Sequence, residues 1–107
     1  MAYGELNKQG DEYLGFLADI TYDAELVLKK AKKPDNPDPT KDYPDWGIFA
    51  KSPAGRDIPA GAGWNKVSKT KKNYISMKIA MGGTPVYMNA VQNPKTDADL
   101  TIMEMGS

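Results

Sequence analysis

The sequence predicts a small all-β domain, either a sandwich or an OB-like barrel of about seven short, mostly antiparallel strands. Apolar side chains recur with period two along much of the chain, as expected for strands with one buried face. Turn signals rich in glycine, proline and asparagine separate these segments at regular spacing. No segment has a convincing helical pattern, so a meander of antiparallel strands is the expected architecture.

The first part of the chain contains two expected strands. Within residues 13–22 the even positions are apolar: Leu14, Phe16, Ala18, Ile20 and Tyr22. Only Leu17 interrupts the opposite face, so we expect a half-buried strand whose even positions face the core. Within residues 24–33, the alternation of Leu26 and Leu28 with their neighbours favours a second strand, although good helix formers leave a short helix as an alternative.

A long exposed loop is expected at about residues 32–44, which contain four prolines. Proline lacks the backbone N–H and fixes φ, so regular structure is not expected there. The later strands are predicted at residues 45–52, 58–68, 73–81, 86–92 and 100–105. The first two of these form a hairpin through a turn at 52–57. The apolar face of 73–81 consists of Ile75, Met77, Ile79 and Met81.

Glycines and methionines in the second half are interpreted as structural residues. Gly61 and Gly63 suit close strand packing or a β-bulge. A phosphate-binding loop is not expected there, because no lysine-serine pair and no helix start follow them. The methionines are expected to fill the core: Met77, Met81, Met88, Met103 and Met105.

Composition bounds the function. The 107 residues fit a single domain over 1–107, and 14 basic residues balance 14 acidic ones. Histidine and cysteine are absent, which removes disulfides, thiol nucleophiles and the common nitrogen and sulfur metal ligands. We therefore expect no enzyme, no metal site and no cofactor. Without an apolar signal core or a membrane-spanning stretch, a cytoplasmic location away from membranes is expected.

The order of several motifs resembles a known bacterial family. Gly4 and Lys8 precede "YLGFLADI", "YPDWGIFA" follows, and then come "IPAGAGWNKVSKTKKNYISMKI" and "PVYMNA". This pattern resembles the domain of unknown function 736, over nearly the whole chain. The resemblance implies a short bacterial protein, often encoded on plasmids, phages and integrated elements beside DNA-processing genes. The family has no settled activity, so it implies no catalytic residue.

The stretch 63–79 is the best candidate for a binding surface. If Val67, Ile75, Met77 and Ile79 face the core, then Trp64, Lys66, Tyr74 and Lys78 share the outward face. The hairpin tip adds Lys69, Lys71 and Lys72. Exposed rings stack on bases without reading sequence while lysines pair with phosphates, so this pattern predicts nucleic-acid binding, with single-stranded DNA favoured. Further stacking rings are expected from Trp46, Phe49 and Tyr87.

A structural interpretation of the same stretch stays open. Lysine-rich hairpin tips commonly serve solubility and edge protection, and Trp64 becomes a core residue if the register slips by one.

Two other classes of function also stay open. A protein-interaction factor from a mobile element, such as an anti-CRISPR or anti-restriction inhibitor of a host defence complex, would use the acidic loop Asp35 to Asp45 against a basic partner. The same aspartates lack the spacing of a calcium loop. An enzyme would have to depend on isolated carboxylates such as Asp57 or Glu104. Edge strands of an open sheet make a homodimer a reasonable expectation.

Overall fold

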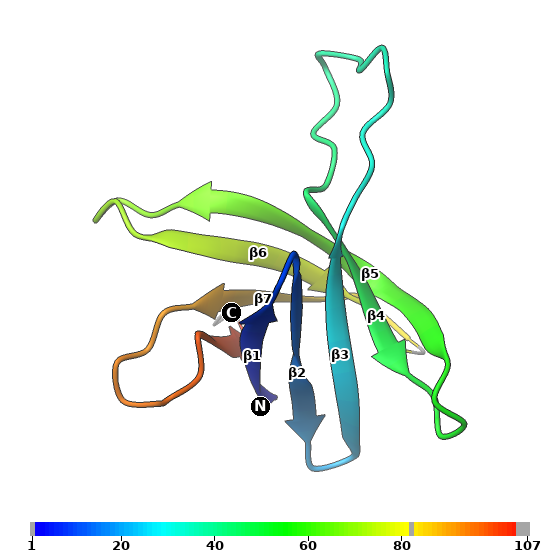
Figure 1. The fold of residues 1–107 in the computed structure, drawn as a ribbon, viewed down its shortest axis with the longest axis vertical. Helices are drawn as coiled ribbons and strands as arrows, with labels where there is room; N and C mark the ends of the chain where they lie inside the picture. Colours follow the sequence, from blue (N-terminus) through cyan, green and yellow to red (C-terminus); the bar gives the residue numbers. More distant parts are fainter. Residues whose placement is uncertain (1, 82, 105–107) are drawn as a thin grey trace.

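Eight strands form a closed antiparallel barrel in the computed structural model, which describes residues 2–81 and 83–104. Each strand pairs with its neighbours in the sequence, and the last strand closes onto the first (Figure 1). The strands are β1 (Tyr3–Gln9), β2 (Glu12–Asp19), β3 (Tyr22–Lys30), β4 (Trp46–Lys51), β5 (Asp57–Val67), β6 (Asn73–Ile79), β7 (Val86–Val91) and β8 (Leu100–Glu104). The all-β prediction is confirmed, and of its two alternatives the barrel is correct.

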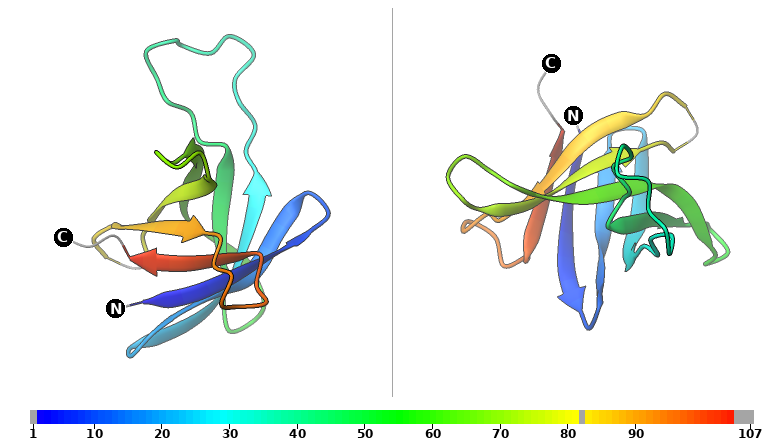
Figure 2. Two further views of the ribbon diagram at one scale, coloured as in Figure 1. Left: turned by 90° about the vertical axis from the view of Figure 1, so that its left-hand side faces the viewer. Right: turned by 90° about the horizontal axis from the view of Figure 1, so that it is seen from above.

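The segment between β3 and β4 forms the predicted proline-rich loop. Residues 31–45 contain no strand and project beyond the end of the barrel (Figures 1 and 2). β3 runs from Tyr22 to Lys30, so residues 24–30 form a strand and not a helix. The loop therefore joins the C-terminal end of β3 to the N-terminal end of β4, and both lie at the same end of the barrel.

The core fills the barrel with side chains from alternate positions of every strand. The largest fully buried apolar residues are Leu6, Leu17, Leu26, Leu28, Ile48, Met77, Met88 and Ile102. Burial of a side chain of this size stabilises a fold by about 1.5–3 kcal/mol. An eight-stranded barrel is just wide enough for such side chains to fill its interior.

The predicted inner face of β2 is wrong. Leu17 is fully buried, whereas Ile20 is 98% exposed in the turn after the strand. Leu14 and Phe16 point outward, where they are partly covered by neighbours; the rings of Phe16 and Tyr3 lie 6.3 Å apart. Apolar residues on the outside of this small barrel shield one another from solvent. The even positions of β2, which carry more apolar residues, were therefore wrongly predicted to face the core.

Small residues shape the inner side of β5. A Cβ atom at Gly61 would lie 2.0 Å from the Lys78 carbonyl oxygen, so only glycine allows β6 to approach this closely. The register between β4 and β5 shifts beside Gly61, where Ile48 opposes Gly61 and Phe49 opposes Pro59. Ala60 is the extra residue of this β-bulge, which is one way for a barrel strand to bend. Both structural interpretations of this glycine segment are therefore correct.

Several predicted core residues lie at the surface. Met81 and Met103 are 37% and 48% exposed, in contrast to the buried Met77 and Met88. Met105 lies outside the described residues. Val67, which was expected to face the core, is 63% exposed because the end of the β5–β6 hairpin extends past the barrel wall (Figure 1).

The closed sheet also removes the basis for the expected homodimer. Because β8 pairs with β1, the barrel has no free strand edge within the part of the chain that the structure describes. Over these same residues, no helix has the length and hydrophobicity that crossing a bilayer requires.

The corrected face of β2 makes a stability prediction. We expect Leu17→Ala to lower the free energy of unfolding by about 2–5 kcal/mol, because it leaves a cavity in the core. Leu14→Ala on the outer face should cost clearly less, because Leu14 is only partly buried. Urea unfolding followed by circular dichroism measures both, and equal or reversed losses would contradict the assignment of the faces.

Candidate nucleic-acid interface

The β5–β6 hairpin places the predicted site residues on its outer side. Trp64 opposes Ser76, Lys66 opposes Tyr74, and Ala62 opposes Lys78. The intervening positions Gly63 and Asn65 oppose the buried Met77 and Ile75, so they face inward. Trp64, Lys66, Tyr74 and Lys78 therefore share one surface, and the register predicted for this hairpin is correct.

Strand β7 extends this surface. Tyr87 opposes Lys78 and Asn89 opposes Ser76, so both lie on the same outer side of the sheet. Tyr87 is 55% exposed. We call the combined surface the hairpin face and define it by Trp64, Lys66, Tyr74, Lys78 and Tyr87. It carries three aromatic rings on three adjacent strands, together with two lysines.

The hairpin tip is an ordered turn that presents three further lysines. Ser68 organises it: its carbonyl accepts from the Lys71 N–H at 2.9 Å, and its own N–H donates to the Lys72 carbonyl at 2.9 Å. Lys71 adopts a positive φ of 63°, a conformation uncommon outside turns. Lys69, Lys71 and Lys72 are exposed, and within residues 2–81 and 83–104 neither they nor Lys78 form an ion pair.

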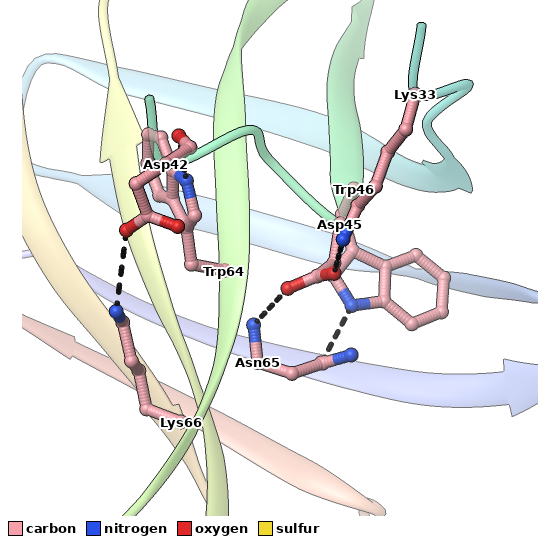
Figure 3. Close-up of polar contacts among 7 residues, drawn as sticks. All are labelled: Lys33, Asp42, Asp45, Trp46, Trp64, Asn65 and Lys66. Carbon is pink, nitrogen blue, oxygen red and sulfur yellow. Dashed lines mark hydrogen bonds and ion pairs between the residues drawn. The ribbon is translucent and has the colours of Figure 1, made fainter. Parts of the chain in front are cut away.

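The end of the proline-rich loop contacts one end of the hairpin face through Asp42. The Trp64 indole N–H donates to the backbone carbonyl of Asp42 at 3.0 Å, and the Asp42 carboxylate lies 3.5 Å from the Lys66 ammonium (Figure 3). Trp64 is consequently half-buried and held in place. The sequence did not predict this contact, because a loop of this composition carries no pattern that shows where it folds back.

Asp45 fixes the loop where it enters β4. Its carboxylate accepts from the Asn65 backbone N–H at 2.8 Å and from the Lys33 ammonium at 2.9 Å (Figure 3). Its own N–H donates to the Gly63 carbonyl at 2.9 Å. The Lys33 hydrogen bond, followed by that of Asn65, lowers the pKa of Asp45 below its ordinary value. Both ends of the loop are thus tied to β5, directly through Asp45 and by way of Lys33.

Two of the three additional stacking rings do not join the hairpin face. Trp46 is a core residue, 7% exposed, whose indole N–H donates to the Asn65 side-chain oxygen at 2.8 Å. Phe49 lies on the outer side of β4 opposite Pro59, five residues along β5 from Trp64, with the Lys29 ammonium 5.4 Å from its ring centre. Trp46 faces the barrel interior opposite Gly63, where a Cβ atom would lie 3.4 Å from the Trp46 Cβ atom. Of the three, only Tyr87 lies on the face.

An open cleft occupies the barrel end beneath the overhanging hairpin. Its volume is about 480 Å³. The buried part of its lining is apolar or aromatic and includes Tyr13, Trp46, Ile75 and Leu100. The exposed part includes Asn65, Lys66, Val67, Asn73 and Gln92, and Tyr74 also borders it. Sequence reasoning missed this cleft because its residues come from five separate strands and from the residue after β7.

The isolated carboxylates have structural partners. Asp57 accepts from Lys29 at 3.1 Å and lies 2.7 Å from the Lys51 ammonium, and these two lysines, Lys51 first, lower its pKa. Glu104 accepts from the Ala2 N–H at 3.1 Å. A carboxyl group held ionised by two lysines is unsuited to donate a proton near neutral pH. Among the described residues, no three acidic side chains gather as a metal ion would require.

Comparison with known proteins identifies one related family. The model of a family described as "Protein of unknown function (DUF736)" matches residues 2–103, nearly the whole chain. No curated protein and no solved structure matches the chain.

The docking of the loop through Asp45 predicts a pH dependence of stability. Because the pKa of Asp45 in the folded protein lies below its ordinary value of 3.8, its stabilisation is present above that pH and is lost as the pH falls through the folded value. We expect Asp45→Asn to lower the urea midpoint at neutral pH, and this difference to shrink when unfolding is repeated below pH 3.8. Asp35→Asn, on an exposed aspartate of the same loop, is the control. A difference that is independent of pH would contradict the ion pair.

Proposed function

This chain belongs to the DUF736 family of proteins of unknown function, and we propose that it is a non-enzymatic nucleic-acid-binding accessory protein of a phage or plasmid that holds single-stranded DNA in the host cytoplasm. The observation that carries the proposal is the hairpin face, where three rings and two lysines share one side of adjacent strands. The tip extends the face with three more exposed lysines.

The chemistry of this face suits a single strand better than a duplex. Unpaired bases expose their faces and stack on aromatic rings, at about 1–3 kcal/mol per base. Trp64, Tyr74 and Tyr87 supply such rings, and the lysines beside them supply cations for the phosphates. Because stacking and phosphate contacts do not read base edges, we expect weak sequence preference.

Asp42 would compete with the phosphate backbone at this surface. Its carboxylate lies 3.5 Å from Lys66, the position that a phosphate oxygen would take. The Asp42 side chain is 75% exposed, so the pair is a weak surface contact that a polyanion can displace. Binding is therefore expected to release the Asp42 carboxylate and to leave the Trp64 ring available for stacking.

The charge of the loop disfavours the alternative function, a mobile-element inhibitor that binds a basic partner through an acidic loop. Residues 31–45 contain four aspartates and also three lysines, a net charge of −1. Asp45 is paired with Lys33 and Asp42 with Lys66. The loop presents little uncompensated negative charge, whereas four lysines of the hairpin have no acidic partner among the described residues.

Tryptophan fluorescence with a single-stranded oligonucleotide tests the proposal. We expect saturable quenching whose affinity falls with salt, with a slope of log K against log salt of up to about −3.5 if all five lysines contact phosphates. Trp64→Ala should abolish most of the quenching. The Lys69/Lys71/Lys72 triple alanine variant should make the slope shallower by about 2.

A triple alanine variant of Lys8, Arg56 and Lys95 is the matched control, because it removes the same charge from exposed basic residues outside the hairpin face and the proline-rich loop. If both triple variants weaken binding equally, the effect comes from the net charge of the protein and not from the lysines of the hairpin tip. Absence of quenching by any nucleic acid would refute the proposal and leave a protein partner as the function to test.

Removal of the Asp42 charge should strengthen binding. Asp42→Asn keeps the backbone carbonyl that holds Trp64 but removes the anion beside Lys66. An exposed ion pair contributes about 0.2–1 kcal/mol, so the affinity for the oligonucleotide should rise up to about fivefold at low salt. Fluorescence anisotropy measures the change, with Asp35→Asn as control; a reduced affinity would show that Asp42 takes no part in competition.

A further inference from the structure

The cleft at the open end of the barrel is the most developed concave feature that the proposed function does not yet use. Its volume of about 480 Å³ lies in the range of small-ligand sites, which is roughly 300–1,000 Å³. The cleft lies mainly on the inner side of the β5–β6 hairpin and meets the hairpin face at Lys66 and Tyr74, which line both.

The inner part of the cleft is aromatic and already rigid. Tyr13 and Trp46 pack edge to face with their ring centres 5.3 Å apart. The Trp46 indole is fixed by its hydrogen bond to the Asn65 side-chain oxygen. A flat ring that enters the cleft contacts aromatic side chains that are already in place. Its binding therefore requires little loss of conformational entropy in the protein.

The outer part of the cleft is rich in side-chain amides. Because the Asn65 oxygen accepts from Trp46, its amide nitrogen remains as a donor toward the cleft. The side-chain amides of Asn73 and Gln92 form no hydrogen bond with any other residue of the described parts. Amides present a donor and an acceptor side by side, which complements the edge of a nucleobase.

The charge of the cleft lining favours an anionic ligand over a cationic one. Among the described residues that line the cleft there is no carboxylate, and Lys66 is the one charged side chain. Lys66 also belongs to the hairpin face, so it lies where the cleft and the face meet. A ligand with a planar polar ring and a neighbouring anionic group satisfies the rings, the amides and this lysine together.

We propose that the cleft binds one nucleobase, with its phosphate directed toward Lys66. The base comes either from a free mononucleotide or from a DNA strand that passes over the hairpin edge from the hairpin face. The second source rests on the proposed function, and the first does not.

Nuclear magnetic resonance titration with mononucleotides tests the cleft by itself. The protein contains two tryptophans, so the Trp64→Phe variant identifies the indole N–H signal of Trp46. We expect that signal and the side-chain amide signals of Asn65 and Gln92 to shift with deoxynucleoside monophosphates, and not with 2-deoxyribose 5-phosphate, which lacks the base. No shift at millimolar concentrations, or equal shifts with the sugar phosphate, would overturn the proposal.

Cleft variants then show whether an oligonucleotide uses the same site. Asn73→Leu and Gln92→Leu change exposed amides and should leave the fold intact. Each should weaken mononucleotide binding about three- to tenfold, the effect of one lost hydrogen bond to the ligand. Asn36→Leu, an exposed amide outside the cleft, is the control. Wild-type affinity for mononucleotides in both cleft variants would overturn the assignment.

The two proposals fail in different ways. If only the hairpin face is wrong, Trp64→Ala leaves oligonucleotide binding unchanged while the mononucleotide shifts at Trp46 persist. If only the cleft is wrong, those shifts are absent while Trp64→Ala still abolishes quenching by the oligonucleotide. An oligonucleotide source for the base is supported when Gln92→Leu weakens oligonucleotide binding as well, and it is overturned when that affinity is unchanged.

Discussion

The lack of a side chain at Gly63, on the inner side of β5, is the constraint on which the rest of the structure depends. A Cβ atom at Gly63 would meet the side chain of Ile75 at 3.0 Å and that of Trp46 at 3.4 Å. Gly63 leaves space in which Trp46 and Ile75 pack at the barrel end, and Gly61 allows β6 to approach β5 closely. The alternation that places Gly63 inward places Trp64 and Lys66 outward. The core and the candidate interface are thus two sides of the same strand.

This arrangement gives β5 three simultaneous partners. Its inner side supports Trp46 through Asn65, its outer side holds the Asp42 carbonyl through Trp64, and its backbone anchors Asp45. The end of the loop, at Asp42 and Asp45, therefore contacts one end of the hairpin face, while the rest of the loop projects beyond the barrel (Figure 1). The contact of Asp42 with Lys66 is exposed and weak in salt, so a polyanion can displace it.

The sequence allowed much of the fold to be predicted, because strand alternation and turn residues are local signals. The outward face with Trp64 was predicted from the apolar face of Ile75, Met77 and Ile79, although a slip of the register by one residue stayed open until the pairing of β5 with β6 was known. The inner face of β2 was predicted wrongly because Leu14 and Phe16 are apolar but lie outside, where other surface groups shelter them. Closure of the barrel could not be predicted from local patterns either, because it depends on pairing between β1 and β8, which lie far apart in the sequence.

The candidate site was only partly predictable for a related reason. Lysines and rings that alternate along one hairpin can be placed from the sequence, whereas the docking of Asp42 and the cleft beside Trp46 arise from contacts between distant segments. Trp46 was wrongly predicted to be an exposed stacking ring, because an aromatic residue at the start of a strand can lie on either face. Its pairing with Gly63, which lies on the inner face, cannot be read from the local sequence.

Mapping of amide chemical shifts during titration with a single-stranded oligonucleotide tests the central claim most directly. The account predicts that the largest changes fall on the outward residues of β5, β6 and β7, on the tip from Ser68 to Lys72, and on Asp42 as its carboxylate is released. The outer surface of β2 and β3 should change little. Changes spread evenly over exposed lysines, or centred on β2 and β3, would contradict the hairpin face as the interface.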